Sequence, residues 1–174
     1  MVEPENPFSW DGRTVKIVSR RSGYVLTAPD KASGTQIVQS NDEEVQGLPL
    51  RRWKLTLITK DNAYKIANVD SGKVLEVLAA NPAEGAAIVQ FDDIVDPSQG
   101  VSHQRWLLIH TTGGAQDTPA FYQIKNVKTG LTINVSGSPT TGESLKDGAP
   151  IIQWKYLDVS TEQWLICDVY EDKK

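Results

Sequence analysis

A threefold internal repeat is the feature of this sequence that most restricts its fold. Three stretches share an apolar strand, a glycine turn and a second apolar strand, and they are Val15–Ala28, Tyr64–Val77 and Tyr122–Val135. Each stretch continues into a segment that ends in glutamine and then closes on a tryptophan. The glutamines are Gln39, Gln90 and Gln153, and the tryptophans are Trp53, Trp106 and Trp164. Such self-similarity predicts three equal structural units.

Each unit is expected to consist of about four short strands. Apolar and polar residues alternate at period two in segments such as Val15–Ser19 and Leu75–Val77, which is the pattern of a half-buried strand. Glycine turns such as Asp70-Ser71-Gly72 separate them, as expected of hairpins. Because no window shows an apolar stripe at helical spacing, the chain is predicted to be all-β.

Three units of this kind are compatible with few architectures. Propellers need roughly four to eight blades, and solenoids need atypical capping repeats. A closed pseudo-threefold barrel removes exposed sheet edges instead. The sequence therefore predicts one domain over residues 1–174, with repeats at roughly 14–58, 63–110 and 121–169.

Composition and charge narrow the function classes. A formal net charge of −4 argues against nucleic acid as a partner, since phosphate binding needs a clustered positive surface. No apolar run approaches the roughly 18 residues of a membrane span, so no membrane insertion is expected. The segment Met1–Phe8 has neither the basic start nor the apolar core of a signal peptide. We therefore expect a cytoplasmic protein or one exported by a non-classical route.

The second repeat carries the residues of a known family. The run Gly85–Gln90 followed by Gln104-Arg105-Trp106 resembles the ricin B-type β-trefoil lectins, whose repeats end in a Gln-x-Trp signature. The resemblance extends from about Thr14 to about Val169. The other two repeats keep the tryptophan but replace the first glutamine, as Arg51 and Glu162. The resemblance implies a β-trefoil that binds glycans or glycoconjugates without catalysis and without a cofactor.

In that family, a sugar site combines an acid or amide, an aromatic residue and a polar residue just before the signature. The first hydrogen-bonds sugar hydroxyls, the second stacks on the apolar side of the ring, and the third fixes orientation. Carried over to the second repeat, the resemblance implies Glu76, Phe91 and either His103 or Gln104.

In the third repeat, the same positions hold Asn134, Trp154 and either Thr161 or Glu162. In the first repeat, Thr27 and Ser40 take the acid and aromatic positions, so no sugar site is expected there. Two interpretations stay open for the strand residues. Trp154 is either a ligand platform or an ordinary surface aromatic, and Glu76 is either a ligand contact or a solvated strand glutamate.

Other functions also remain open at this stage. A protein-binding β-trefoil, such as a protease inhibitor, would present one of the two insertions, 92–102 or 113–119. A receptor-binding module of a larger toxin or adhesin is a third possibility. Two histidines and one cysteine offer no spaced metal ligands and no recognisable catalytic set, so neither a metal nor an active site is expected. A homo-oligomer would raise the avidity of weak sites.

Overall fold

Twelve strands, four from each repeat, make up the structure, a computed structural model that describes residues 10–42, 48–95, 101–114 and 118–169. The strands are β1 (Thr14–Ser19), β2 (Val25–Thr27), β3 (Val38–Ser40), β4 (Trp53–Ile58), β5 (Ala63–Asn68), β6 (Val74–Val77), β7 (Ile88–Phe91), β8 (Trp106–Thr112), β9 (Phe121–Asn126), β10 (Thr132–Val135), β11 (Ile151–Trp154) and β12 (Trp164–Asp168). Short 3-10 helices lie between them: η1 (Leu48–Arg51), η2 (Leu78–Ala80), η4 (Val101–Gln104), η5 (Gly142–Leu145) and η6 (Ser160–Glu162). The described residues contain no α-helix, and the all-β prediction is confirmed.

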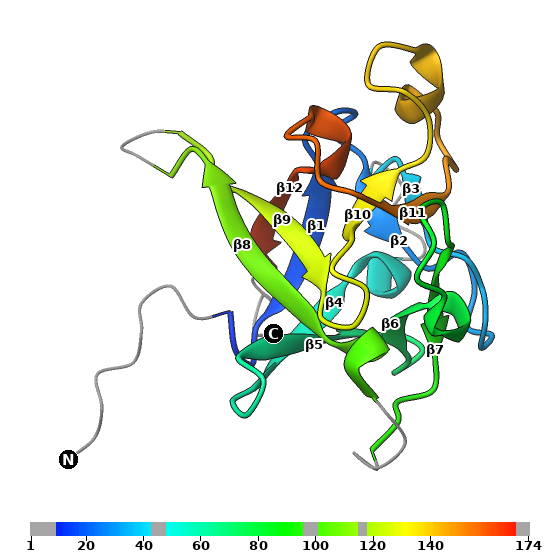
Figure 1. Ribbon diagram of the computed structural model, residues 1–174, viewed down its shortest axis with the longest axis vertical. Coiled ribbons are helices and arrows are strands. Elements are labelled where there is room, and N and C mark those ends of the chain that lie inside the picture. The colour runs from blue at the N-terminus through cyan, green and yellow to red at the C-terminus, as the bar shows by residue number, and fades with distance from the viewer. Residues whose placement is uncertain (1–9, 43–47, 96–100, 115–117, 170–174) are drawn as a thin grey trace.

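Six of the strands close into a barrel. β1, β4, β5, β8, β9 and β12 pair in that order, all antiparallel, and β12 pairs back onto β1. The other six form three hairpins, β2–β3, β6–β7 and β10–β11, each attached to the first strand of its own repeat. Single bridges between the hairpins link all three to one another. This is a β-trefoil, and Figure 1 shows the barrel strands with the hairpins beside them.

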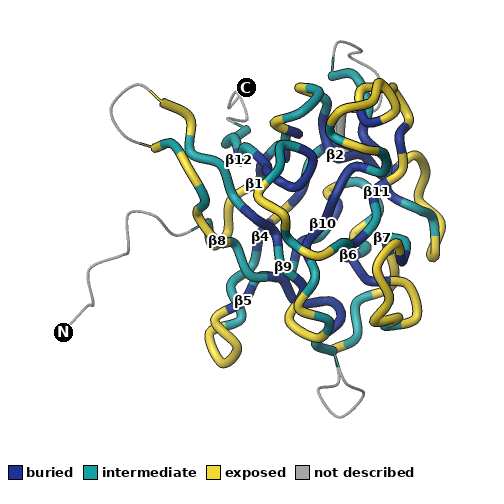
Figure 2. The backbone as a smooth tube through the Cα atoms, turned by 45° about the horizontal axis from the view of Figure 1, so that its top comes forward, coloured by how far each residue is buried: buried dark blue, intermediate teal, exposed yellow. Residues whose placement is uncertain are grey.

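The core is built from the closing tryptophans and the apolar side of every strand. Trp53, Trp106 and Trp164 are each 0% exposed, as expected of scaffold residues. Each indole Nε1 donates to a backbone carbonyl in the hairpin of its own repeat, namely that of Leu26 (2.8 Å), Leu75 (3.0 Å) and Ile133 (3.2 Å). The barrel strands alternate buried residues with partly exposed ones, the hairpin strands β2, β6 and β10 are buried throughout, and many of the connecting loops are exposed (Figure 2).

Three buried glutamines tie the repeats into a ring. Gln39, Gln90 and Gln153 are each 0% exposed. Each amide oxygen accepts a hydrogen bond from a hydroxyl in the turn of its own repeat, and these donors are Ser22, Ser71 and Thr129. Each amide nitrogen donates to two carbonyls of a different repeat: Gln39 to Ser144 and Lys146, Gln90 to Asp30 and Ala32, and Gln153 to Asn81 and Ala83. The third repeat thus holds the second, the second holds the first, and the first holds the third.

The turns between the first two strands of each repeat have the geometry that the sequence predicts. Gly23, Gly72 and Gly130 have φ values of 77°, 69° and 71°, which a side chain would strain. Of the two predicted insertions, residues 96–100 and 115–117 lie outside the described residues. No helix in the described part of the chain is long and apolar enough to cross a membrane.

Replacing Gln153 with leucine should lower the free energy of unfolding by about 2–4 kcal/mol, because a hydroxyl and two carbonyls lose their partner. Urea denaturation followed by circular dichroism measures the change. Gln36 is the matched control, since its half-buried side chain donates one bond of 3.3 Å to the Ile151 carbonyl. Gln36→Leu should cost less than about 1 kcal/mol. Equal losses in the two variants would show that the ring of glutamines does not hold the repeats together.

Candidate functional site

The third repeat contains a pocket lined by all four residues predicted for it. Asn134 from β10, Trp154 from β11, and Thr161 and Glu162 from η6 surround a cavity of about 400 Å³. Leu157, Val159, Ile152 and the segment 135–139 complete its wall. Trp154 is half-buried, whereas the preceding Gln153 is fully buried. Because neighbouring residues in a strand face opposite ways, the inward glutamine turns the indole outward to the pocket.

The polar side chains of this pocket form a supported pair. Asn134 is 7% exposed and Glu162 is 0% exposed. The Asn134 amide nitrogen donates to Glu162 Oε1 at 3.3 Å, and the backbone N–H of Leu157 donates to Glu162 Oε2 at 2.8 Å. Burial raises the pKa of the Glu162 carboxyl, while hydrogen bonds from the backbone around Leu157 act in the opposite direction. Glu162 therefore hydrogen-bonds both the Asn134 side chain and the backbone of the loop before η6.

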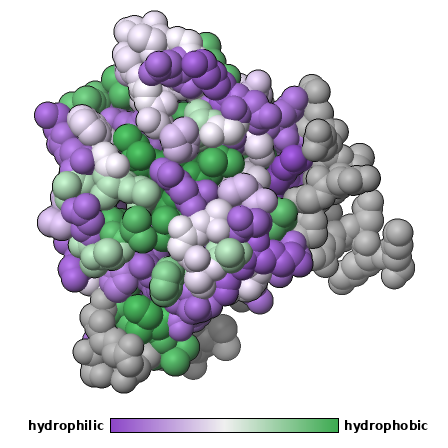
Figure 3. Space-filling model, turned by 90° about the vertical axis from the view of Figure 1, so that its right-hand side faces the viewer, coloured by the Kyte–Doolittle hydropathy of each residue, from purple (hydrophilic) through white to green (hydrophobic). Residues whose placement is uncertain are grey.

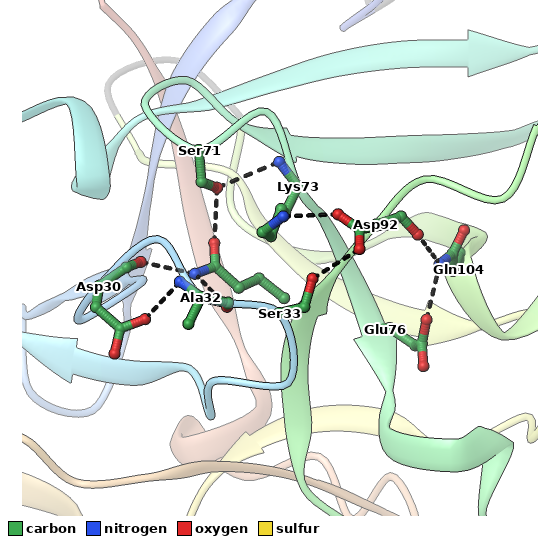
Figure 4. A network of polar contacts seen from close by, with 9 residues as sticks. Asp30, Ala32, Ser33, Ser71, Lys73, Glu76, Asp92 and Gln104 are labelled. Carbon is green, nitrogen blue, oxygen red and sulfur yellow. Dashed lines mark hydrogen bonds and ion pairs between the residues drawn. The ribbon is translucent and has the colours of Figure 1, made fainter.

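The second repeat repeats this geometry with Glu76 and Gln104. Gln104 is 0% exposed, and its amide nitrogen donates to Glu76 Oε2 at 2.7 Å and to the Asp92 carbonyl at 2.9 Å (Figure 4). Its amide oxygen accepts the backbone N–H of Ile94 at 3.0 Å. His103 Nε2 lies 3.6 Å from the same Glu76 oxygen. Glu76 is 5% exposed, so it is a buried, hydrogen-bonded group and not a solvated strand glutamate.

Phe91 completes the second set at the end of β7. Its side chain is 38% exposed, and the loop that follows it is fixed by charge pairs. The Asp92 carboxylate accepts hydrogen bonds from Lys73 Nζ at 2.6 Å and from the Ser33 hydroxyl at 2.9 Å (Figure 4). Both bonds lower the pKa of Asp92, with Lys73 as the larger cause. The face that carries β7 and β11 mixes hydrophilic residues with a central group of hydrophobic ones (Figure 3).

In the two repeats, the acid and the amide have exchanged places. The strand residue is the carboxylate in repeat 2 (Glu76) and the amide in repeat 3 (Asn134). The partner in the 3-10 helix is the amide in repeat 2 (Gln104) and the carboxylate in repeat 3 (Glu162). Both pairs are separated by 28 residues in sequence. Sequence comparison aligned these four positions but did not predict their direct contact.

The first repeat has different chemistry at the same place. The hydroxyls of Thr27 and Ser40 lie 2.5 Å apart and bond each other. A pocket of about 280 Å³ here is lined by aliphatic, hydroxyl and charged residues, including Arg51 and Asp147, with no aromatic residue in its described lining. The absence of a sugar site in this repeat stays a prediction.

A separate pocket was missed by sequence reasoning. It has a volume of about 540 Å³ and is lined by Trp10, Tyr64, Leu108, His110, Gly113, Gly114, Ala120 and Tyr122. Tyr122 makes edge-on contacts with both Trp10 and His110. None of the residues that line this pocket belongs to the two acid–amide pairs, Glu76–Gln104 and Asn134–Glu162. Across the described ranges, no group of three or more histidine, cysteine, aspartate or glutamate side chains is placed to hold a metal ion.

Comparison with known proteins gives a consistent result. The family model described as "Ricin-type beta-trefoil lectin domain-like" matches residues 7–91 and 102–173. No curated protein sequence matches significantly.

Three solved structures illustrate the likeness. The designed threefold-symmetric protein ThreeFoil is 25% identical, with a TM-score of 0.73 over 90% of this chain and 99% of that one. The exo-β-1,3-galactanase of Clostridium thermocellum is 26% identical (TM-score 0.72), and the match covers 91% of this chain but 31% of the enzyme. The Macrolepiota procera ricin B-like lectin, solved with lactose, is 18% identical (TM-score 0.66) over 90% of this chain and 96% of that one.

Replacing Glu162 with glutamine should stabilise the fold at pH 7. A neutral amide would avoid the desolvation that raises the pKa of the Glu162 carboxyl, its oxygen would accept the Leu157 N–H, and Asn134 would turn its own oxygen toward the new N–H. A gain of about 1 kcal/mol corresponds to about 2–4 °C in Tm. Because burial raises the pKa of the Glu162 carboxyl in the folded state, the ionised group destabilises the fold only as the pH rises above 4.5, the ordinary value. The gain in Tm from Glu162→Gln should therefore be smaller at pH 4 than at pH 7.

Thermal denaturation at pH 7 and pH 4 tests this expectation. Glu143→Gln is the matched control, since Glu143 is an exposed glutamate in η5 and should change Tm little at either pH. A loss of Tm on Glu162→Gln at pH 7, or the same gain at both pH values, would contradict the role assigned to this carboxylate.

Proposed function

Because the chain belongs to the ricin-type β-trefoil lectin domain-like family, we propose that it is a non-catalytic lectin that binds glycans through sites in its second and third repeats. The observation that carries the proposal is the pocket of the third repeat. It brings an outward indole, an oriented amide and an apolar wall together in one cavity. These are the groups that a sugar ring needs, since it has one apolar side and a rim of hydroxyls.

The third repeat is the stronger of the two sites. Trp154 offers its ring as a stacking surface, and the Asn134 amide nitrogen is hydrogen-bonded to Glu162. Because Asn134 is already oriented, little side-chain entropy is lost when a ligand binds. The third-repeat pocket has a volume of about 400 Å³, which falls in the range of small-ligand sites.

The second repeat offers the same kinds of group on its own hairpin. Glu76 presents a carboxylate anchored by Gln104, and Phe91 supplies the aromatic surface at the end of β7. The carboxylate accepts hydrogen bonds from sugar hydroxyls, and a bond to an ionised acceptor is stronger than one between neutral groups. Phenylalanine has a smaller face than tryptophan, so we expect weaker stacking here.

Two modest sites on one chain favour multivalent partners. Shallow single sites bind weakly, and joining two raises avidity without new contacts when both reach the same glycoconjugate. The proposed partners are therefore glycans displayed in several copies, and self-association of the chain would add further sites.

Trp154→Ala should weaken glycan binding at the third repeat by at least about tenfold, because the stacking surface is lost. The fold should survive, since the indole is half-buried and lies outside the core cluster. A glycan array on the parent, including lactose, identifies the ligands, and titration calorimetry measures the loss. Tyr24→Ala, a half-buried aromatic in the first repeat, is the control and should leave affinity unchanged. Unchanged binding by Trp154→Ala would remove the third repeat as a site.

A further inference from the structure

The exchanged acid–amide pairs differ in the atoms that they leave for a ligand. In repeat 2, Glu76 Oε2 is occupied by Gln104 and lies near His103, while Oε1 makes no hydrogen bond among the described residues. In repeat 3, Asn134 uses one N–H on Glu162, and its Oδ1 and second N–H make no other hydrogen bond in the described part of the chain. Neither Glu76 Oε1 nor Asn134 Oδ1 is among the unpaired polar atoms cut off from solvent, and Asn134 lines the repeat-3 pocket.

Chemistry fixes the orientation of Asn134. An ionised carboxylate only accepts hydrogen bonds, so the amide must turn its nitrogen toward Glu162. The same reasoning applies to Gln104, whose nitrogen must face Glu76 and whose oxygen accepts the Ile94 N–H. The strand residue of repeat 2 is therefore an acceptor only, whereas that of repeat 3 is both an acceptor and a donor.

This difference selects between free and substituted sugar oxygens. A hydroxyl can donate to Glu76, but an ether, ester or amide carbonyl oxygen cannot, and it would face the carboxylate as a second acceptor. Against Asn134, such an oxygen can accept the remaining N–H, and a hydroxyl can donate to Oδ1. A polar group left unpaired in a binding site costs about ten- to hundredfold in affinity.

We propose that the exchange sets ligand specificity: the repeat-2 site needs a free hydroxyl, whereas the repeat-3 site also accepts a sugar substituted at the contacting oxygen. Such sugars include residues inside a chain and residues carrying an acyl group. This inference rests on the proposed lectin function. The wall of the repeat-3 pocket supports it, because Leu157, Val159 and Pro139 line the same cavity as Asn134 and Trp154 and offer apolar surface that a substituent can contact.

Two single-site variants separate the specificities. Phe91→Ala leaves repeat 3 as the reporter, and Trp154→Ala leaves repeat 2. Each is tested on an array of paired glycans that differ only in O-methylation, O-acetylation or further glycosylation of the terminal sugar. Trp154→Ala should bind the substituted member of a pair at least about tenfold more weakly than the free one at the contacting position. Phe91→Ala should bind both members within about threefold.

Reciprocal exchange tests the residues themselves. Asn134→Glu with Glu162→Gln, added to Phe91→Ala, rebuilds the repeat-2 pair in repeat 3 and should impose the free-hydroxyl requirement. Glu76→Asn with Gln104→Glu, added to Trp154→Ala, should relax it. Circular dichroism and Tm confirm that each variant is folded, and if either exchange unfolds the chain, the paired-glycan ratios of the two single-site variants alone decide.

The outcomes distinguish the specificity inference from the proposed lectin function on which it rests. If the parent binds no glycan on the array, both are overturned. If the parent binds but the two single-site variants show the same ratio of free to substituted ligand, the specificity inference fails and the lectin function stands. Folded exchange variants that keep their original ratios would likewise overturn the role of the pair.

Discussion

The ring of buried glutamine hydrogen bonds is the interaction on which the rest of the molecule depends. Each hairpin belongs to one repeat by sequence but is fixed in place by the amide of another. Only a side chain that accepts at one end and donates twice at the other can satisfy a hydroxyl and two carbonyls together. A carboxylate of similar size would lack the donors, and an apolar residue would leave all three groups unpaired. Glutamine at these positions is therefore a chemical requirement of the threefold arrangement.

The same ring positions the candidate sites. Gln153 and Trp154 are neighbours on β11, so anchoring the glutamine inward decides that the indole faces the pocket. Gln90 does the same for Phe91 on β7. Alternation along a strand thus links a scaffold residue, which must be the same in each repeat, to an outward residue, which is under no such constraint. The serine, phenylalanine and tryptophan at the three outward positions show how far they have diverged on a common frame.

The sequence predicted what local pattern and symmetry determine. The strands, the glycine turns and the three matched glutamines and tryptophans follow from period-two alternation and from three matching copies. The contacts Glu76–Gln104 and Asn134–Glu162 were not predicted, although the family resemblance named all four residues. Each contact joins a strand to a 3-10 helix that lies 28 residues later in the sequence, and a local repeat pattern cannot predict contacts between residues so far apart. The aromatic pocket at Tyr64 and Tyr122 was missed for a similar reason, because Trp10 reaches it from before the first strand.

The two pairs hold their loops with different kinds of bonds. In repeat 2, the neutral Gln104 fastens the loop after β7 through both an acceptor and a donor, the Asp92 carbonyl and the Ile94 N–H. In repeat 3, the Glu162 carboxylate can only accept, and it takes backbone hydrogen bonds from Leu157, Val159 and Asp158. Burying that carboxylate has a cost, which its raised pKa expresses. Repeat 3 therefore carries a desolvation cost behind its pocket, and in return Asn134 faces the pocket as an amide. That exchange is understandable if the amide is what the site requires, because the arrangement with the acid on the strand is already present one repeat earlier in the same chain.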